Sequence, residues 1–252
     1  MKSPLRPNTR FSCLSEIKKL IEPKSKISSL FLYEGNLEFE LSKLEHTIIA
    51  HTNKRFIFEF WYNFLSHPES FINSVESLLK LLSDYELTIF QRNWFNNNNA
   101  VARSVLFFLL HNSSSLSQVS CGDISKKRIT PMTLSRLKSF KTKNFFPFFD
   151  DCENTLDGLS SVGDVNYVLL PVGDYSLNLF EQGKNKGPEM YTFNHKEIHA
   201  RVKDLDKKCI LLYKNHPALF NLYKSFNIKM VDKYGRVADN KESCEDLIIT
   251  NF

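Results

Sequence analysis

Residues 165–175 read VNYVLLPVGDY, and this stretch decides the fold. Five of the six residues at 165–170 are apolar, and Pro171 and Gly173 then break the run. A short apolar run bounded by breakers is typical of a strand buried on both faces of a mostly parallel sheet. Ligands of open α/β sheets bind just beyond the carboxyl ends of such strands. We therefore expect residues 170–175 to line any active site.

The chain on either side alternates between predicted strands and helices. Further strands are expected at 27–32, 47–50, 144–149, 209–213 and 246–252. Helices are expected at 12–21, 55–65, 69–82, 98–111, 195–205 and 217–226. Strand, turn, helix and strand in succession form the opening half of a nucleotide-binding α/β unit. The fold class predicted is therefore α/β and Rossmann-like, with a mostly parallel central sheet flanked by helices.

The middle of the chain has a different character and is strongly basic. No acidic residue occurs between Asp123 and Asp150, whereas seven lysines and arginines do. We expect residues 1–84 and 144–252 to form one Rossmann-like domain, and residues 85–143 to be a small inserted helical or hairpin subdomain. Cations without neighbouring acids are available to DNA phosphates, although a merely solvated face would look the same in sequence. The predicted DNA-binding residues are Lys126, Lys127, Arg128, Arg136 and Lys138.

Composition excludes some classes of protein and leaves others open. The formal net charge of +5 over 252 residues is compatible with nucleic-acid binding without requiring it. The five cysteines are scattered without a C-x-x-C pair, which indicates neither a zinc site nor a disulfide framework and favours a cytoplasmic protein. His195 and His199 have the spacing of metal ligands but no third ligand, so no metal is expected. The apolar run 105–110 is too short to span a membrane.

Three strings of residues carry a family resemblance. They are MYTFNH at 190–195, LLYKNHP at 211–217 and EDLIITNF at 245–252. Together they resemble the Dam-type (D12 class) N6-adenine DNA methyltransferases, and the likeness runs in the same order along most of the chain. The resemblance implies a methyltransferase version of the Rossmann-like fold, S-adenosylmethionine as cofactor, and a DNA-recognition subdomain at the basic insertion.

The catalytic motif that the resemblance implies is degenerate. The family has D-P-P-Y after its central strand, where oxygen atoms hold the amino group of a flipped adenine and the tyrosine stacks on the base. Here the motif reads Leu170-Pro171-Val172-Gly173, so the carboxylate and the ring are both missing. A shift of register would use Asp174 and Tyr175 instead, and we regard this rescue as the less favoured reading.

The cofactor positions are also altered. In the family's F-x-G-x-G loop only Gly35 remains, and Tyr33 and Glu34 stand where close approach of the cofactor needs glycine, so we expect their bulk to fill the cofactor space. His51 or Thr52 replaces the acidic residue for the cofactor ribose, and Asp150 or Asp151 matches an acid that contacts the cofactor adenine. We therefore expect no cofactor, with retained S-adenosylmethionine binding as the alternative.

The function expected from these residues is that of a non-catalytic Dam-like protein that binds double-stranded DNA as a regulator or scaffold. Its protein partner would be an active methyltransferase or another subunit. Two alternatives remain open at this stage: a divergent, active adenine methyltransferase, and a structural subunit of a larger assembly.

Overall fold

A computed structural model describes residues 2–7, 10–151, 155–161, 163–175 and 187–252. In that part of the chain, seven strands form one sheet in the order β3-β2-β1-β4-β5-β7-β6. The strands are β1 (Lys26–Ser29), β2 (Thr47–Thr52), β3 (Phe145–Phe149), β4 (Tyr167–Gly173), β5 (Lys208–Lys214), β6 (Asn227–Asp232) and β7 (Cys244–Thr250). All pairings among strands β1, β2, β3, β4 and β5 are parallel. Strand β7 runs antiparallel to both of its neighbours, β5 and β6. The predicted α/β fold with a mostly parallel sheet is confirmed and is Rossmann-like.

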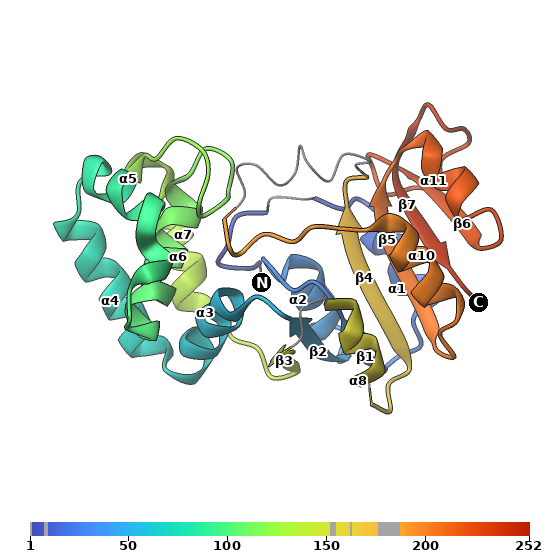
Figure 1. The fold of residues 1–252 in the computed structure, drawn as a ribbon, viewed down its shortest axis with the longest axis horizontal. Coiled ribbons are helices and arrows are strands. Elements are labelled where there is room, and N and C mark those ends of the chain that lie inside the picture. Colours follow the sequence, from blue (N-terminus) through green and yellow to red (C-terminus); the bar gives the residue numbers. More distant parts are fainter. Residues whose placement is uncertain (1, 8–9, 152–154, 162, 176–186) are drawn as a thin grey trace.

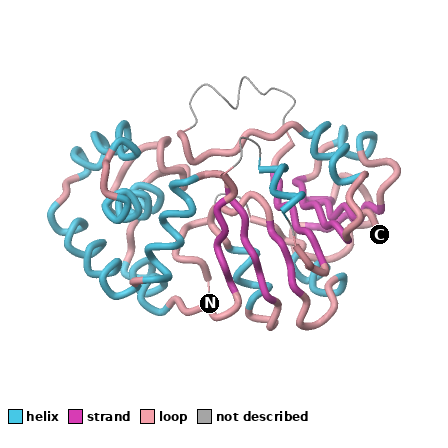
Figure 2. The backbone as a smooth tube through the Cα atoms, turned by 60° about the horizontal axis from the view of Figure 1, so that its bottom comes forward, coloured by secondary structure: helices cyan, strands magenta, loops and turns pink. Residues whose placement is uncertain are grey.

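Helices cover both faces of the sheet and form a separate lobe beside its β3 edge (Figures 1 and 2). The sheet helices are α1 (Leu14–Leu20), α2 (Asn36–Ser42), α8 (Gly158–Ser161), α10 (His195–Lys203) and α11 (Pro217–Leu222). The lobe contains α3 (Arg55–Ser66), α4 (Pro68–Leu81), α5 (Asp84–Asn93), α6 (Ala100–Ser113) and α7 (Pro131–Ser139). Among the described helices, none has both the length and the hydropathy needed to cross a membrane.

A hydrophobic core lies on each face of the sheet, and successive residues of a central strand point into opposite cores. Leu169 of β4 and Leu212 of β5 pack with α1, α2 and the lobe, whereas Leu170 and Leu211 pack with α8, α10 and α11. All four side chains are fully buried. This two-sided burial is the physical reason why these strands read as unbroken apolar runs.

Strand β4 is longer than predicted. We expected Pro171 to end it, but the strand continues to Gly173, and its register with β5 shifts between these two residues. Proline lacks the N–H that a regular ladder needs, and a bulge accommodates this loss. Pro147 lies in the edge strand β3, the other position in a sheet where proline is tolerated.

The lobe begins before the expected boundary at residue 84 and is held by aromatic packing. Helices α3 and α4 pack against α6, and rings such as Phe60, Phe71 and Phe107 meet between them. The inserted residues 85–143 are mainly helical. The expected hairpin is reduced to a single antiparallel bridge between Ser114 and Ile124. Strand β6 and helices α5 and α7 were not predicted from the sequence.

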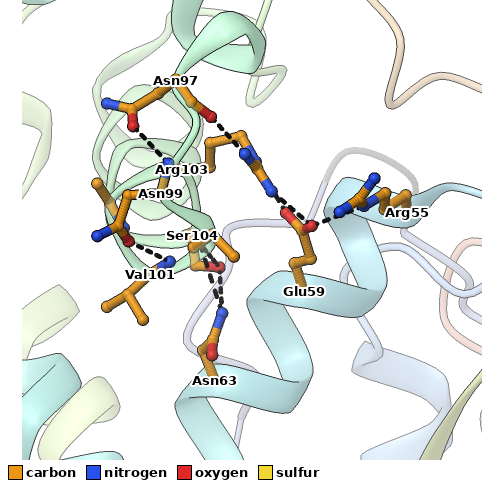
Figure 3. Close-up of polar contacts among 10 residues, drawn as sticks. Arg55, Glu59, Asn63, Asn97, Asn99, Val101, Arg103 and Ser104 are labelled. Carbon is orange, nitrogen blue, oxygen red and sulfur yellow. Dashed lines mark hydrogen bonds and ion pairs between the residues drawn. The ribbon is translucent and has the colours of Figure 1, made fainter.

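A buried ion pair fixes α3 to α6 (Figure 3). The guanidinium of Arg103 donates through Nη2 and Nε to the two carboxylate oxygens of Glu59, at 2.6 and 2.9 Å. Arg55 also reaches Glu59 at 2.9 Å, but its side chain is 70% exposed. Only the Arg103 contact is therefore shielded from solvent, and its loss should cost more stability than the loss of the Arg55 contact.

Replacing Arg103 by methionine should lower the free energy of unfolding by about 3 kcal/mol, because the buried Glu59 carboxylate keeps only the exposed Arg55 as a charge partner. Arg55→Met removes the same charge from the same carboxylate and should change the free energy by less than about 1 kcal/mol. Urea denaturation followed by circular dichroism gives both values. Equal losses in the two variants would contradict this account.

Candidate functional site

The main cavity lies at the carboxyl ends of β1 and β4 and has a volume of about 570 Å³. Strand order reverses between these two neighbours, which makes their shared end the usual ligand position of a doubly wound sheet. The walls of the cavity are formed by the loop after β1, the end of β4, the N-terminal segment and a segment that precedes α10. Aromatic lining residues are Phe11, Phe31, Tyr33, Tyr191 and Phe193.

Both signs of charge line this cavity. The cations are Lys2, Arg10 and Arg136, and the acids are Glu34, Glu38, Glu40 and Asp174. Two of the acids are engaged inside the protein: Glu38 is buried and accepts a hydrogen bond from Ser29, and Glu40 pairs with Lys43. Burial raises the pKa of Glu38. The net charge that the cavity wall presents to a ligand is therefore more positive than a count of its charged residues suggests.

Residues 187–194, which we call the strap, cross from the lobe to α10 (Figure 1, orange). At the lobe, the Glu189 carboxylate accepts hydrogen bonds from the Ser120 N–H and hydroxyl at 3.0 and 2.9 Å. At the sheet, the Tyr191 hydroxyl donates to the carbonyl of Leu32 at 2.8 Å. The strap thus joins the inserted lobe to the end of β1.

The strap is closely packed and shields the groups beneath it. A Cβ atom on Gly187 would lie 1.9 Å from the Ser120 hydroxyl, so no larger residue fits there without movement. Burial raises the pKa of Glu189 and of Tyr191 and lowers that of Lys54, which lies under the strap. These directions describe a site from which water is largely excluded.

The polar groups that would hold the cofactor adenosine are bonded to one another. Nδ1 of His51 lies 3.0 Å from a carboxylate oxygen of Asp150, and both side chains are buried. The Thr52 hydroxyl bonds with the hydroxyl of Tyr191. Because the single Tyr191 proton goes to Leu32, Thr52 is the donor in that bond. Asp151, the other predicted acid, is exposed.

In the loop after β1, which keeps only one glycine of the family's motif, Tyr33 was expected to fill the cofactor space. The Tyr33 ring turns toward the lobe and packs near Phe107 and His111. Gly35 has φ +69° and precedes α2, where a Cβ would lie 2.6 Å from the ring of Phe39. The side chains that pack over the end of β1 are instead Phe31 and the strap residues Tyr191 and Phe193, whose ring centroids lie 5.5 and 4.8 Å from that of Phe31.

The degenerate catalytic motif is built into the core. Leu170 is fully buried in the core under α10 and α11, and Val172 is also buried. Gly173 has φ +83°, a conformation that side chains other than glycine rarely adopt. Asp174 lines the cavity, but the ring of Tyr175 packs against His195 and His216, with centroids 4.5 and 4.6 Å away. The two residues of the shifted register are thus not presented together.

The predicted DNA-binding cations have different surroundings. Arg136 lines the cavity and Lys127 is exposed, whereas Lys126 and Arg128 donate to backbone carbonyls of the lobe. The expectation that these cations face no acids is wrong for Lys138, whose ammonium lies 2.5 Å from Glu76 of α4.

Two groups of functional interest were missed by sequence reasoning. The first is the strap, and its only signal was its place in the string 190–195. The second is a set of N-terminal arginines: Arg6 donates to the carbonyls of Asn112 and Ser114, and burial together with the charges of Arg128 and Arg10 lowers its pKa. Arg10 itself lines the cavity. Arginines from two distant segments are therefore close neighbours beside the cavity.

No metal centre is found among the described residues, since no group of three or more His, Cys, Asp or Glu side chains is placed to hold an ion. His195 and His199 instead contact aromatic rings, those of Tyr175 and Tyr223 among them. Comparisons with known protein families and with curated proteins found no match.

An acid placed at the first position of the degenerate motif, Leu170, should destabilise the folded protein. Leu170→Asp places a carboxylate in a fully buried apolar site and should lower the free energy of unfolding by at least about 3 kcal/mol. Leu170→Met keeps the volume and should lower it by less than about 1.5 kcal/mol. Thermal and urea unfolding measure both, and a stable Leu170→Asp protein would show that the site is more open to water than described.

Proposed function

We propose that this protein binds double-stranded DNA without modifying it, and that it is a non-catalytic relative of the Dam-type methyltransferases. The observation that carries the proposal is the gathering of Lys2, Arg10 and Arg136 on the walls of one cavity, between the lobe and the carboxyl edge of the sheet. These cations come from segments more than 100 residues apart in sequence. Three cations gathered on one surface suit the phosphate backbone of DNA, and two of the four acids beside them are already engaged by Ser29 and Lys43.

The topology agrees with the resemblance. The order β3-β2-β1-β4-β5-β7-β6 is Rossmann-like, as the resemblance implies, and the lobe is inserted between β2 and β3. In the family that the sequence resembles, such an insertion recognises DNA. The protein would thus retain the DNA-facing architecture of that family.

The absence of methyl transfer is proposed from the site itself. The position of the motif carboxylate is the buried Leu170, and the position of the stacking ring is Gly173. The His51 and Asp150 side chains bond to each other, and the Thr52 side chain bonds to Tyr191 of the strap. S-Adenosylmethionine would have to displace the strap to reach these groups.

The DNA proposal is tested by the salt dependence of binding to a mixed-sequence duplex, followed by fluorescence anisotropy. Each phosphate contact contributes about 0.9 to the slope of log K against log salt. Replacing Arg10 and Arg136 by alanine should therefore make the slope shallower by about 2 and weaken binding at low salt. Sequence preference should be weak, because phosphate contacts do not read bases.

The matched control is Lys203→Ala/Lys224→Ala, which removes the same charge from exposed residues that do not line the cavity. It should leave the slope unchanged. Equal effects of the two double variants would indicate nonspecific charge attraction. A wild-type protein that does not bind duplex at low salt would favour the structural-subunit alternative.

A further inference from the structure

A tight turn after β6, Asp232–Arg236, presents an aromatic ring between two cations. We call it the β6 turn. The Tyr234 side chain is 72% exposed, and Lys233 and Arg236 on either side of it are exposed. The Lys233 ammonium lies 5.1 Å from the centre of the Tyr234 ring. In the described part of the chain, no ion pair involves either cation. The cationic charge and the ring are thus both available to a partner.

The backbone of the turn is fixed from within. One carboxylate oxygen of Asp232 accepts hydrogen bonds from the N–H groups of Tyr234 and Arg236 at 2.8 and 2.9 Å. The N–H of Gly235 donates to the Asp232 carbonyl at 3.0 Å, and Gly235 has φ +79°. The only acid of the turn is therefore used to shape it and does not neutralise its neighbours.

The turn is also fixed to the rest of the protein at the start of α1. The Ser15 hydroxyl donates to the carbonyl of Gly235 at 2.6 Å, and a Cβ on Gly235 would lie 2.7 Å from the Ser12 carbonyl oxygen. Arg10, a cation of the cavity wall, is two residues before Ser12. The turn is thus anchored to a segment that begins two residues after a cation of the cavity wall.

A rigid, exposed ring with flanking cations has the chemistry that recognises single-stranded nucleic acid. Bases stack on aromatic side chains, and neighbouring lysines and arginines hold the phosphates on either side. A ring that is 72% exposed adds little to folding, while its fixed backbone reduces the entropy lost when a base binds. A membrane surface would instead require a broader apolar face than one tyrosine.

We propose that the β6 turn is a second nucleic-acid contact, in which Tyr234 stacks on an unpaired base and Lys233 and Arg236 bind the adjoining phosphates. The inference rests on the proposed function in that its ligand is DNA, and it adds that DNA with a single-stranded segment is the preferred form.

The test compares a blunt duplex with the same duplex carrying a short single-stranded extension, by fluorescence anisotropy. The wild-type protein should bind the extended DNA more tightly. Tyr234→Ala should weaken binding to the extended DNA by about 5- to 100-fold and leave the blunt duplex unaffected. Tyr234→Phe keeps the ring and should retain the preference. Tyr85→Ala removes a tyrosine that is 74% exposed in the lobe and should change neither affinity.

Equal wild-type affinities for the two DNAs, or the same loss in Tyr85→Ala as in Tyr234→Ala, would overturn the inference. Binding to anionic phospholipid vesicles that depends on Tyr234, without any preference for the extended DNA, would also overturn it. Failure of the proposed function looks different: Arg10→Ala/Arg136→Ala would then leave duplex binding unchanged, whatever the turn variants do.

Discussion

The hydrogen bond from the Tyr191 hydroxyl to the Leu32 carbonyl is the contact on which the rest of the site depends. It holds the strap against the end of β1 and brings Tyr191 within reach of Thr52 at the end of β2. At its other end the strap is bonded to Ser120 of the lobe through Glu189. One segment therefore covers the carboxyl ends of β1 and β2 and at the same time fixes the lobe beside the cavity.

This arrangement explains how a Rossmann-like sheet can keep a cavity at the carboxyl ends of its strands while the polar side chains there are bonded within the protein. Thr52 bonds to Tyr191 of the strap, and the neighbouring His51 pairs with Asp150. Buried polar groups that already have partners gain little by exchanging them for those of a ligand. The cations Lys2, Arg10 and Arg136 line the same cavity as the strap residues Tyr191 and Phe193, and under the proposed function they contact DNA.

The sequence predicted the parts of the fold that local patterning controls. The apolar runs of β4 and β5 identify buried strands because both faces of the sheet are covered, and the helices expected at 55–65 and 195–205 correspond to α3 and α10. The strap could not be predicted, since Tyr191 and Leu32 are 159 residues apart and nothing near Tyr191 indicates its partner. The Lys138–Glu76 pair was missed for the same reason. The substitutions at Leu170 and Gly173 were visible in sequence, but their burial and backbone conformation were not.

The central claim, that the cofactor side is closed while the DNA side is open, is tested most directly by calorimetric titration with S-adenosylmethionine. The titration is made on the intact protein, alone and with saturating duplex DNA. The account predicts no saturable heat in either case, because Tyr191 and Thr52 already occupy each other at the site. Saturable binding with a stoichiometry near one would contradict it and would favour the active-methyltransferase alternative.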